Sequence, residues 1–230
     1  MTLPERDEIP LTPRKPVPPC YTGTDIAIPA TYGDARRVMF GRAGPCTNAL
    51  VIVSLFGLRY FLGQWSWMDT AMALLVIGGF GVIEWILHAY LMHARPLPLL
   101  GWRIRSIVFY KHSDHHKDPW DPETLFFKWQ TILAGVALLT LIGYVITFFD
   151  ERAMITFSAC VMLMLMQHEW FHVLVHSKIE PRSAYIKARL DNHRYHHYRD
   201  NRVSMGVCTL SGDWVFGTLG LSLEKKNPSR

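Results

Sequence analysis

The sequence predicts an all-α integral membrane protein with four transmembrane helices and a histidine-rich helical cap on the cytoplasmic side. Half of the 230 residues are hydrophobic, and the mean hydropathy is slightly positive, which is apolar for a soluble protein. Four apolar stretches match a hydrocarbon core of about 30 Å at about 1.5 Å per residue. The 11 histidines all lie at or after residue 88, and ten of them form four tight clusters.

The chain begins with a proline-rich stretch. Residues 1–46 hold 8 of the 14 prolines and no histidine. Pro16, Pro18 and Pro19 favour extended backbone over a packed core. We therefore expect a cytoplasmic N-terminal arm over residues 1–46, followed by one transmembrane domain over residues 47–230.

The first two spans are expected at residues 47–63 and at about residues 70–93. Arg59 lies near the end of the first span, where its side chain can extend to the membrane interface. Asp69 can cap the second helix, which is apolar in its middle except for Glu84. The second helix carries the first histidine pair at its far end.

Two further spans and an amphipathic helix follow. Asp121-Pro122-Glu123 predicts the start of a third helix that continues to about Phe149. The fourth helix is expected over about residues 153–176, with a histidine pair at its end. Pro181 can open a polar helix that presents the last histidine cluster, and the glycine-rich segment after Asn201 is expected to be irregular.

The positions of the basic residues predict the orientation. Of the 24 Lys and Arg, 6 lie in residues 1–46, 6 in 92–128 and 10 in 177–230, and only Arg59 and Arg152 fall elsewhere. By the positive-inside rule, both termini and the middle loop are cytoplasmic, as are all four histidine clusters. This pattern argues against a soluble helical bundle. It also accounts for the net charge of +5, so this charge does not indicate a nucleic acid partner. We expect a multi-pass protein of a bacterial inner membrane.

The spacing of the histidines predicts metal binding. The four clusters have the patterns H-x4-H, H-x2-H-H, H-x3-H and H-x2-H-H. Residues three and four apart share a helix face, so each H-x2-H-H is expected to aim three imidazoles in one direction. Ten imidazoles are too many for one ion and suit two ions with open positions; imidazole is a ligand for iron, zinc, copper and nickel. Scattered histidines in a basic protein would not produce two triplets and two pairs.

These clusters, in this order and between paired spans, resemble the fatty acid hydroxylase/sterol desaturase superfamily of membrane non-haem di-iron enzymes. The ending NHRYHHYRDNRVSMGVCTLSGDWVFGT is also similar to the last motif of that family. The set most resembles the fatty acid or ceramide 2-hydroxylase branch, over roughly residues 50–220. The resemblance implies a four-span fold with a cytoplasmic cap and these metal ligands: His88, His93, His112, His115, His116, His172, His176, His193, His196 and His197.

The expected reaction is hydroxylation of a lipid or fatty acyl chain, with desaturation as the alternative within the same superfamily. An unactivated C–H bond requires an oxidant made on a cofactor from O2 and two electrons. We expect two iron ions, which zinc can replace in overexpressed protein. Residues 1–46 are too short for a fused haem domain, so we expect electrons from a separate ferredoxin, cytochrome or reductase.

Four other polar residues are candidates for supporting the ligands. Glu84 lies one turn before the first histidine pair, and it either accepts a ligand N–H or forms a polar bond between helices. His168 is expected to hydrogen-bond near the ligands, with an eleventh ligand as the alternative. Asp114 and Asp191 either orient neighbouring imidazoles or are solvated surface acids.

Two other functions fit parts of the sequence. Residues 168–172 read H-E-x-x-H, the signature of zinc metalloproteases, in which Glu169 would be the general base. That interpretation leaves most of the clustered histidines unexplained. A histidine-rich metal carrier is also conceivable, but transport needs ionisable groups through the bilayer, and the first and third predicted spans carry no histidine.

Overall fold

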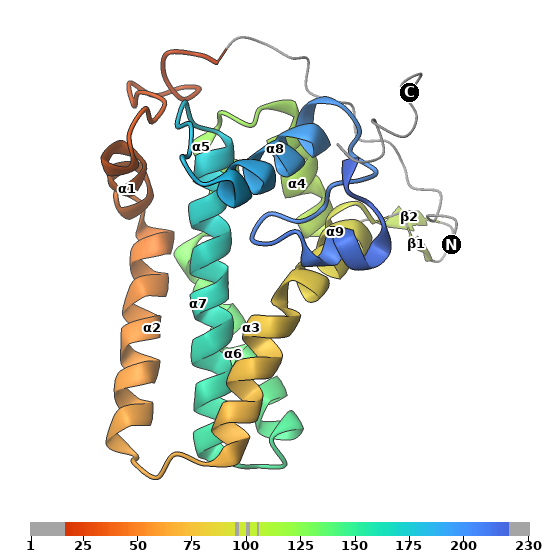
Figure 1. Ribbon diagram of the computed structural model, residues 1–230. Coiled ribbons are helices and arrows are strands. Elements are labelled where there is room, and N and C mark those ends of the chain that lie inside the picture. The colour runs from red at the N-terminus through yellow and green to blue at the C-terminus, as the bar shows by residue number, and fades with distance from the viewer. Residues whose placement is uncertain (1–16, 95–96, 100–101, 105, 221–230) are drawn as a thin grey trace. The chain divides into compact units, whose positions relative to one another are not determined.

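The computed structural model describes residues 17–94, 97–99, 102–104 and 106–220 of the chain. The described residues are mainly helical (Figure 1). The elements are α1 Tyr32–Phe40, α2 Ala43–Phe61, α3 Trp67–Leu87, the π-helical turn η1 His88–Met92, β1 Leu97–Leu99, β2 Trp102–Ile104, α4 Ile107–Lys117, α5 Pro122–Leu125, α6 Trp129–Ile146, α7 Glu151–Val175, α8 Ala184–Tyr198 and α9 Ser211–Phe216. The helical class is therefore as predicted.

The chain divides into two compact units. Unit 1 comprises Met1–Tyr32, Gly81–Leu125 and Phe171–Arg230, and unit 2 comprises Gly33–Phe80 and Phe126–Trp170. The predicted boundary between an arm and a domain at residue 46 remains a prediction. Of the residues in that arm, 1–16 lie outside the described part, Tyr32–Phe40 form α1, and α2 begins at Ala43.

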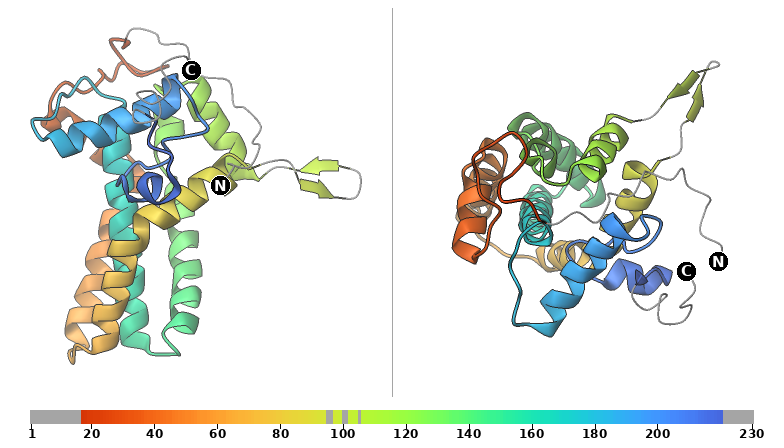
Figure 2. Two further views of the ribbon diagram at one scale, coloured as in Figure 1. Left: turned by 45° about the vertical axis from the view of Figure 1, so that its right-hand side comes forward. Right: turned by 90° about the horizontal axis from the view of Figure 1, so that it is seen from above.

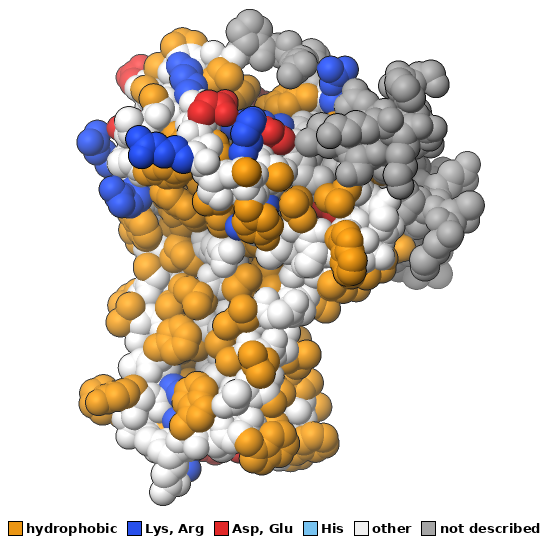
Figure 3. Space-filling view, viewed as in Figure 1, with side chains coloured by type: hydrophobic (Ala, Val, Ile, Leu, Met, Phe, Trp, Pro, Cys, Tyr) orange, Lys and Arg blue, Asp and Glu red, His pale blue; other side chains and the backbone are white. Residues whose placement is uncertain are grey.

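Three helical segments are long and apolar enough to cross a membrane: Trp67–Met92, Pro122–Ile146 and Glu151–Val175. A fourth would be α1 with α2, a pair bent by 89°. The four predicted spans thus correspond to three helical segments and one bent pair. Figure 3 shows hydrophobic side chains over the visible face of unit 2. Exposed residues of α2 and α3 in that unit include Leu50, Val53, Leu58, Leu74, Leu75 and Ile77.

The connection between α2 and α3 in unit 2 is held by a buried ion pair. Arg59 donates from Nε and Nη2 to the two carboxylate oxygens of Asp69, at 2.6 and 2.7 Å. The side chain of Arg59 is 4% exposed and also donates to the carbonyls of Gly63 and Gln64 after α2, and its place at the membrane interface stays a prediction. Asp69 lies in the first turn and exchanges hydrogen bonds with Ser66, as in a capping box, so α3 begins at Trp67.

The third predicted helix is interrupted, and several elements were not predicted: α1 lies in the expected arm, α4 and a hairpin lie in the expected loop, and α9 lies in the segment expected to be irregular. Asp121 accepts the backbone N–H of Glu123 at the start of the short helix α5, and α6 begins only at Trp129. In unit 1, β1 and β2 form an antiparallel hairpin in which Leu97 pairs with Ile104. Figure 2 shows this hairpin extending away from α4. The segment was expected to be a basic loop.

Candidate metal centre

The π-helical turn η1 in unit 1 brings the first histidine pair together. Five residues along an α-helix are about 140° apart around the axis, so H-x4-H does not lie on one face. Here the backbone N–H of His93 donates to the carbonyl of His88 at 3.1 Å, the i to i+5 pattern of a π turn. The wider turn moves both imidazoles to one side, and their ring centroids lie 5.2 Å apart.

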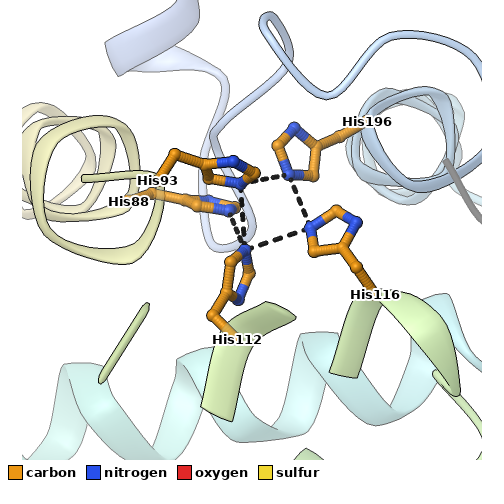
Figure 4. A group of neighbouring side chains, drawn as sticks. All are labelled: His88, His93, His112, His116 and His196. Carbon is orange, nitrogen blue, oxygen red and sulfur yellow. Dashed lines mark hydrogen bonds between the residues drawn. The ribbon is translucent and has the colours of Figure 1, made fainter. Parts of the chain in front are cut away.

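Five imidazoles from three elements form the first group. His88 comes from η1 and His93 directly follows it, His112 and His116 come from α4, and His196 comes from α8. In Figure 4, four Nε2 atoms form a closed ring through His112, His93, His196 and His116, with sides of 3.0, 3.1, 3.1 and 3.1 Å. Two ligands at 90° around an ion lie about 3.0 Å apart when each metal–nitrogen bond is about 2.1 Å. The ring therefore has the spacing of neighbouring nitrogen ligands.

Hydrogen bonds alone do not explain this ring. The Nδ1 atoms of His88 and His196 lie 2.6 and 2.9 Å from the carbonyl oxygens of Met205 and Val203. Each neutral imidazole carries one N–H, so Nε2 of these two histidines presents a lone pair. The other three histidines can supply three N–H donors for the five Nε2 contacts. At least two contacts therefore lack a matched donor and acceptor, whereas a cation bound by Nε2 lone pairs would satisfy every histidine of the ring.

Four imidazoles form the second group: His115 from α4, His172 from the last turn of α7, His176 directly after α7, and His197 from α8. Both ring nitrogens of His176, and both of His197, are buried without a hydrogen-bond partner among the described residues. A buried polar atom without a partner is costly. Nitrogen atoms held in this state fit the donor set of a metal ion.

His193 lies beside both groups, and the two groups touch. Its ring centroid is 4.9 Å from that of His197 and 5.2 Å from that of His196, and neither ring nitrogen has a described partner. The rings of His116 and His197 stack at 4.3 Å between centroids. The structure thus brings all ten predicted ligands together within unit 1, nine of them in the two groups and His193 next to both.

The histidine triplets are split between the two groups, which differs from the prediction that each aims in one direction. His112 and His116 are four residues apart on α4 and join the first group, whereas His115 joins the second. On α8, His196 and His197 separate in the same way. Consecutive residues of an α-helix are about 100° apart, so one helix serves two neighbouring centres.

The electrostatic environment keeps these imidazoles neutral. Burial, and then the charge of neighbouring histidines, holds the pKa of His112 and His116 well below the usual value. The same causes lower the pKa of His193 and His197. Since a neutral imidazole is the form that binds metal, the site is arranged for ligation at neutral pH.

The loop after α8 orients two ligands of the first group. The carbonyls of Val203 and Met205 contact Nδ1 of His196 and His88, as described above, so the lone pair of each ring is on Nε2, where a metal ion would bind. Glu84 accepts the backbone N–H groups of Val207 and Cys208 at 3.0–3.2 Å. Glu84 was predicted to bond a ligand N–H or another helix, and the structure shows that it fixes this loop.

Asp213 of α9 is a supporting residue that the sequence reasoning missed. Its two carboxylate oxygens accept from the backbone N–H of Met205 and Gly206, from Asn192 Nδ2 and from Thr218 Oγ1, at 2.6–2.9 Å. The side chain is fully buried. The signal in the sequence was available, because Asp213 is the only charged residue between residues 203 and 220.

The remaining candidates lie outside the two groups. Asp114 forms an exposed ion pair with Lys117, and Asp191 pairs with Lys187 and Arg194. Both acids therefore form ion pairs at the surface and do not orient imidazoles, which is the second of the two expectations. His168 lies in unit 2, 6.4 Å between ring centroids from Phe127.

Comparison with known proteins identifies the family. The family model described as fatty acid hydroxylase matches residues 73–218. Fatty acid 2-hydroxylase from Macaca fascicularis is 26% identical over 71% of this chain and 43% of its own length. The human fatty acid 2-hydroxylase is 25% identical over 72% of this chain and 40% of its own length. The matched region thus spans about two fifths of these relatives.

A solved structure shares the fold. The chain described as full-length Scs7p, with only its hydroxylase domain visible, is similar with a TM-score of 0.61 and 19% identity. The similarity covers 76% of this chain and 64% of that one. The family match spans more than half of the sequence and contains every histidine of both groups. The chain therefore belongs to the fatty acid hydroxylase family.

Proposed function

We propose that this protein is a membrane di-iron oxygenase that hydroxylates a lipid or fatty acyl chain. The observation that carries the proposal is the pair of touching histidine groups in unit 1, one of five and one of four imidazoles, with His193 beside both. The human relative is named a fatty acid 2-hydroxylase, which supports hydroxylation over desaturation.

The residues of the site would divide their tasks between binding and orientation. Two bound iron ions would supply the activation of O2 that attack on an unactivated C–H bond requires. The first group and the second group would each hold one ion, with His193 completing the second. The carbonyls of Val203 and Met205 would keep the metal-binding nitrogens of His196 and His88 unprotonated. Burial of the imidazoles would limit the access of water.

The proposed setting is a membrane with the site on its cytoplasmic side. The distribution of Lys and Arg supports cytoplasmic termini, and a bacterial inner membrane remains our expectation. Electrons would come from a separate ferredoxin, cytochrome or reductase. Zinc would be able to occupy the same nitrogen ligands in overexpressed protein.

The arrangement gives little support to a metalloprotease. In that mechanism Glu169 would act as the general base on a metal-bound water. Instead its Oε1 accepts the backbone N–H of Phe127 at 3.0 Å. His172, the second histidine of the motif, groups with three histidines from outside it.

The proposed activity can be tested by lipid mass spectrometry. Cells that express the protein are grown under ¹⁸O2, and their lipids are compared with those of cells that express the His115→Ala variant. We expect a hydroxylated acyl lipid that carries one ¹⁸O atom with the unchanged protein and not with the variant. An acyl lipid with a new double bond and no added oxygen would instead identify a desaturase.

A further inference from the structure

Arg189 of α8 is a buried cation, and no acidic side chain of the described residues lies within ion-pair distance of its guanidinium. Only 5% of the Arg189 surface is exposed. Among the described residues Arg189 forms no ion pair, and its Nε and Nη2 atoms are buried without a hydrogen-bond partner. A buried charge normally has a partner, because removing it from water is costly. Burial accordingly lowers the pKa of the Arg189 guanidinium.

Two aromatic rings hold this guanidinium. Its Cζ atom lies 3.4 Å from the ring centroid of Phe171 and 5.5 Å from that of Tyr185. A guanidinium stacked on a ring keeps its N–H groups in its own plane, at the edge. The aromatic contacts therefore fix the orientation of Arg189 and leave the Nε–Nη2 edge for another partner. Tyr185 is more than half exposed, so this position lies close to the surface of unit 1.

The same edge binds carboxylates elsewhere in the chain. Arg59 donates from Nε and Nη2 to Asp69, and Arg202 donates from Nε and Nη2 to Asp200 at 2.9 and 3.1 Å. This bidentate pairing matches two parallel N–H groups to two oxygens of a carboxylate or phosphate. Arg189 presents the same two donors with no acid from the described chain to accept them.

The position of Arg189 connects this edge to the metal centre. Arg189 precedes His193 by four residues on α8, which is about one helical turn, or roughly 6 Å along the axis. Phe171, which the guanidinium covers, immediately precedes His172 on α7. Arg189 is therefore one turn from His193 and packs on the residue next to His172, and both histidines are ligands of the proposed second metal.

We propose that the Nε–Nη2 edge of Arg189 binds the anionic oxygen group of an acyl lipid and so positions the first carbons of its chain beside the metal centre. The shared chemistry is that of a carboxylate or a phosphate with two acceptor oxygens. A free fatty acid would supply the first and an acyl phospholipid or phosphatidic acid the second. The proposal rests on the proposed hydroxylase function, and it narrows the substrate to a lipid with a negative group close to the carbon that reacts.

The test measures binding, so it needs neither metal turnover nor an electron donor. Native mass spectrometry of the purified protein in a non-ionic detergent compares hexadecanoate, hexadecyl phosphate and the neutral hexadecanol. We expect one of the two anions to bind at least tenfold more tightly than hexadecanol. The preferred anion then assigns the source, a fatty acid or a phosphate-bearing lipid. Equal binding of all three probes would overturn the proposal.

Variants locate the effect. Arg189→Met should reduce the preference for the anion at least tenfold, and Arg189→Lys should retain part of it, because the charge remains without the planar edge. Lys187→Met removes the same charge from an exposed position of the same helix and should leave the preference unchanged. A preference that survives in Arg189→Met, or that falls equally in Lys187→Met, would contradict the assignment. If Arg189→Met does not fold, the Arg189→Lys variant and the comparison of probes on the unchanged protein still show whether Arg189 binds the anion.

The two proposals can fail separately. Selective anion binding in a protein that adds no oxygen to lipids would refute the proposed hydroxylase activity, whereas the proposed anion site would stand. Incorporation of ¹⁸O into a lipid without any selectivity for the anionic probes would refute the role of Arg189 and leave the hydroxylase.

Discussion

Asp213 offers a quantitative test of how the first histidine group is held. The change Asp213→Asn keeps the size of the side chain and replaces one acceptor oxygen with an N–H2 donor. Four donors converge on the carboxylate in the structure, two of them from the loop backbone at Met205 and Gly206. The amide would lose about two of these hydrogen bonds, each worth about 1.5–3 kcal/mol when the acceptor is charged. The expected loss is about 3–6 kcal/mol, a large part of a typical stability of about 5–15 kcal/mol.

The effect on metal binding should be selective. The loop that Asp213 holds carries the carbonyls that orient His88 and His196, and both belong to the first group. Loss of such support typically lowers metal affinity about 10–100-fold. We expect Asp213→Asn to lower the melting temperature and to lose one metal of two during a chelator titration at concentrations that leave the second in place.

A matched variant controls for the chemical change. Asp114→Asn makes the same exchange at a carboxylate that is 61% exposed and pairs with Lys117, where exposed pairs contribute about 0–1 kcal/mol. We expect this variant to keep the melting temperature and both metals. If Asp213→Asn also kept both metals in the chelator titration, the loop would not control metal binding by the first group, and the reasoning would be refuted.

Three further predictions concern packing, charge and pH. Gly212→Ala should destabilise by about 1–3 kcal/mol in thermal unfolding, because the added methyl would lie 2.4 Å from a backbone oxygen of α3; Gly78→Ala, which meets nothing within 4 Å, should be neutral or stabilising. Arg59→Met should cost about 3–5 kcal/mol by leaving buried Asp69 without its partner, and an unchanged melting temperature would count against the ion pair. The metal-free protein should lose stability as the pH falls below about 6.5. The buried imidazoles have a pKa below that of the unfolded chain, so the unfolded state binds more protons and acid favours it; denaturant midpoints that stay constant from pH 7 to 5 would contradict this.

The spacing of the histidines was sufficient to predict which imidazoles come together in unit 1. Clusters at intervals of three and four residues identify helix faces, and ten such residues exceed the needs of one ion. The four apolar segments likewise follow from composition, since a span needs only enough consecutive apolar residues. These features are local, and local features are what a single sequence displays.

The arrangement within the centre depends on contacts that are distant in sequence. The π turn that aligns His88 with His93 has no marker in H-x4-H itself. The division of each triplet between two groups depends on how α4 and α8 are rotated toward each other within unit 1. A lone charged residue marks Asp213 in the sequence, but its partners are set by contacts with the loop at Met205 and with Asn192 of α8.

Metal content in two adjacent variants tests the central claim most directly. Elemental mass spectrometry of detergent-purified protein from iron-supplemented cells should give close to two metals per chain, iron or substituted zinc. His196→Ala and His197→Ala change neighbouring residues of α8 that belong to different groups. We expect each variant to retain about one metal, because each damages a different site. One metal per chain in the unchanged protein, insensitive to both substitutions, would contradict the two-metal centre.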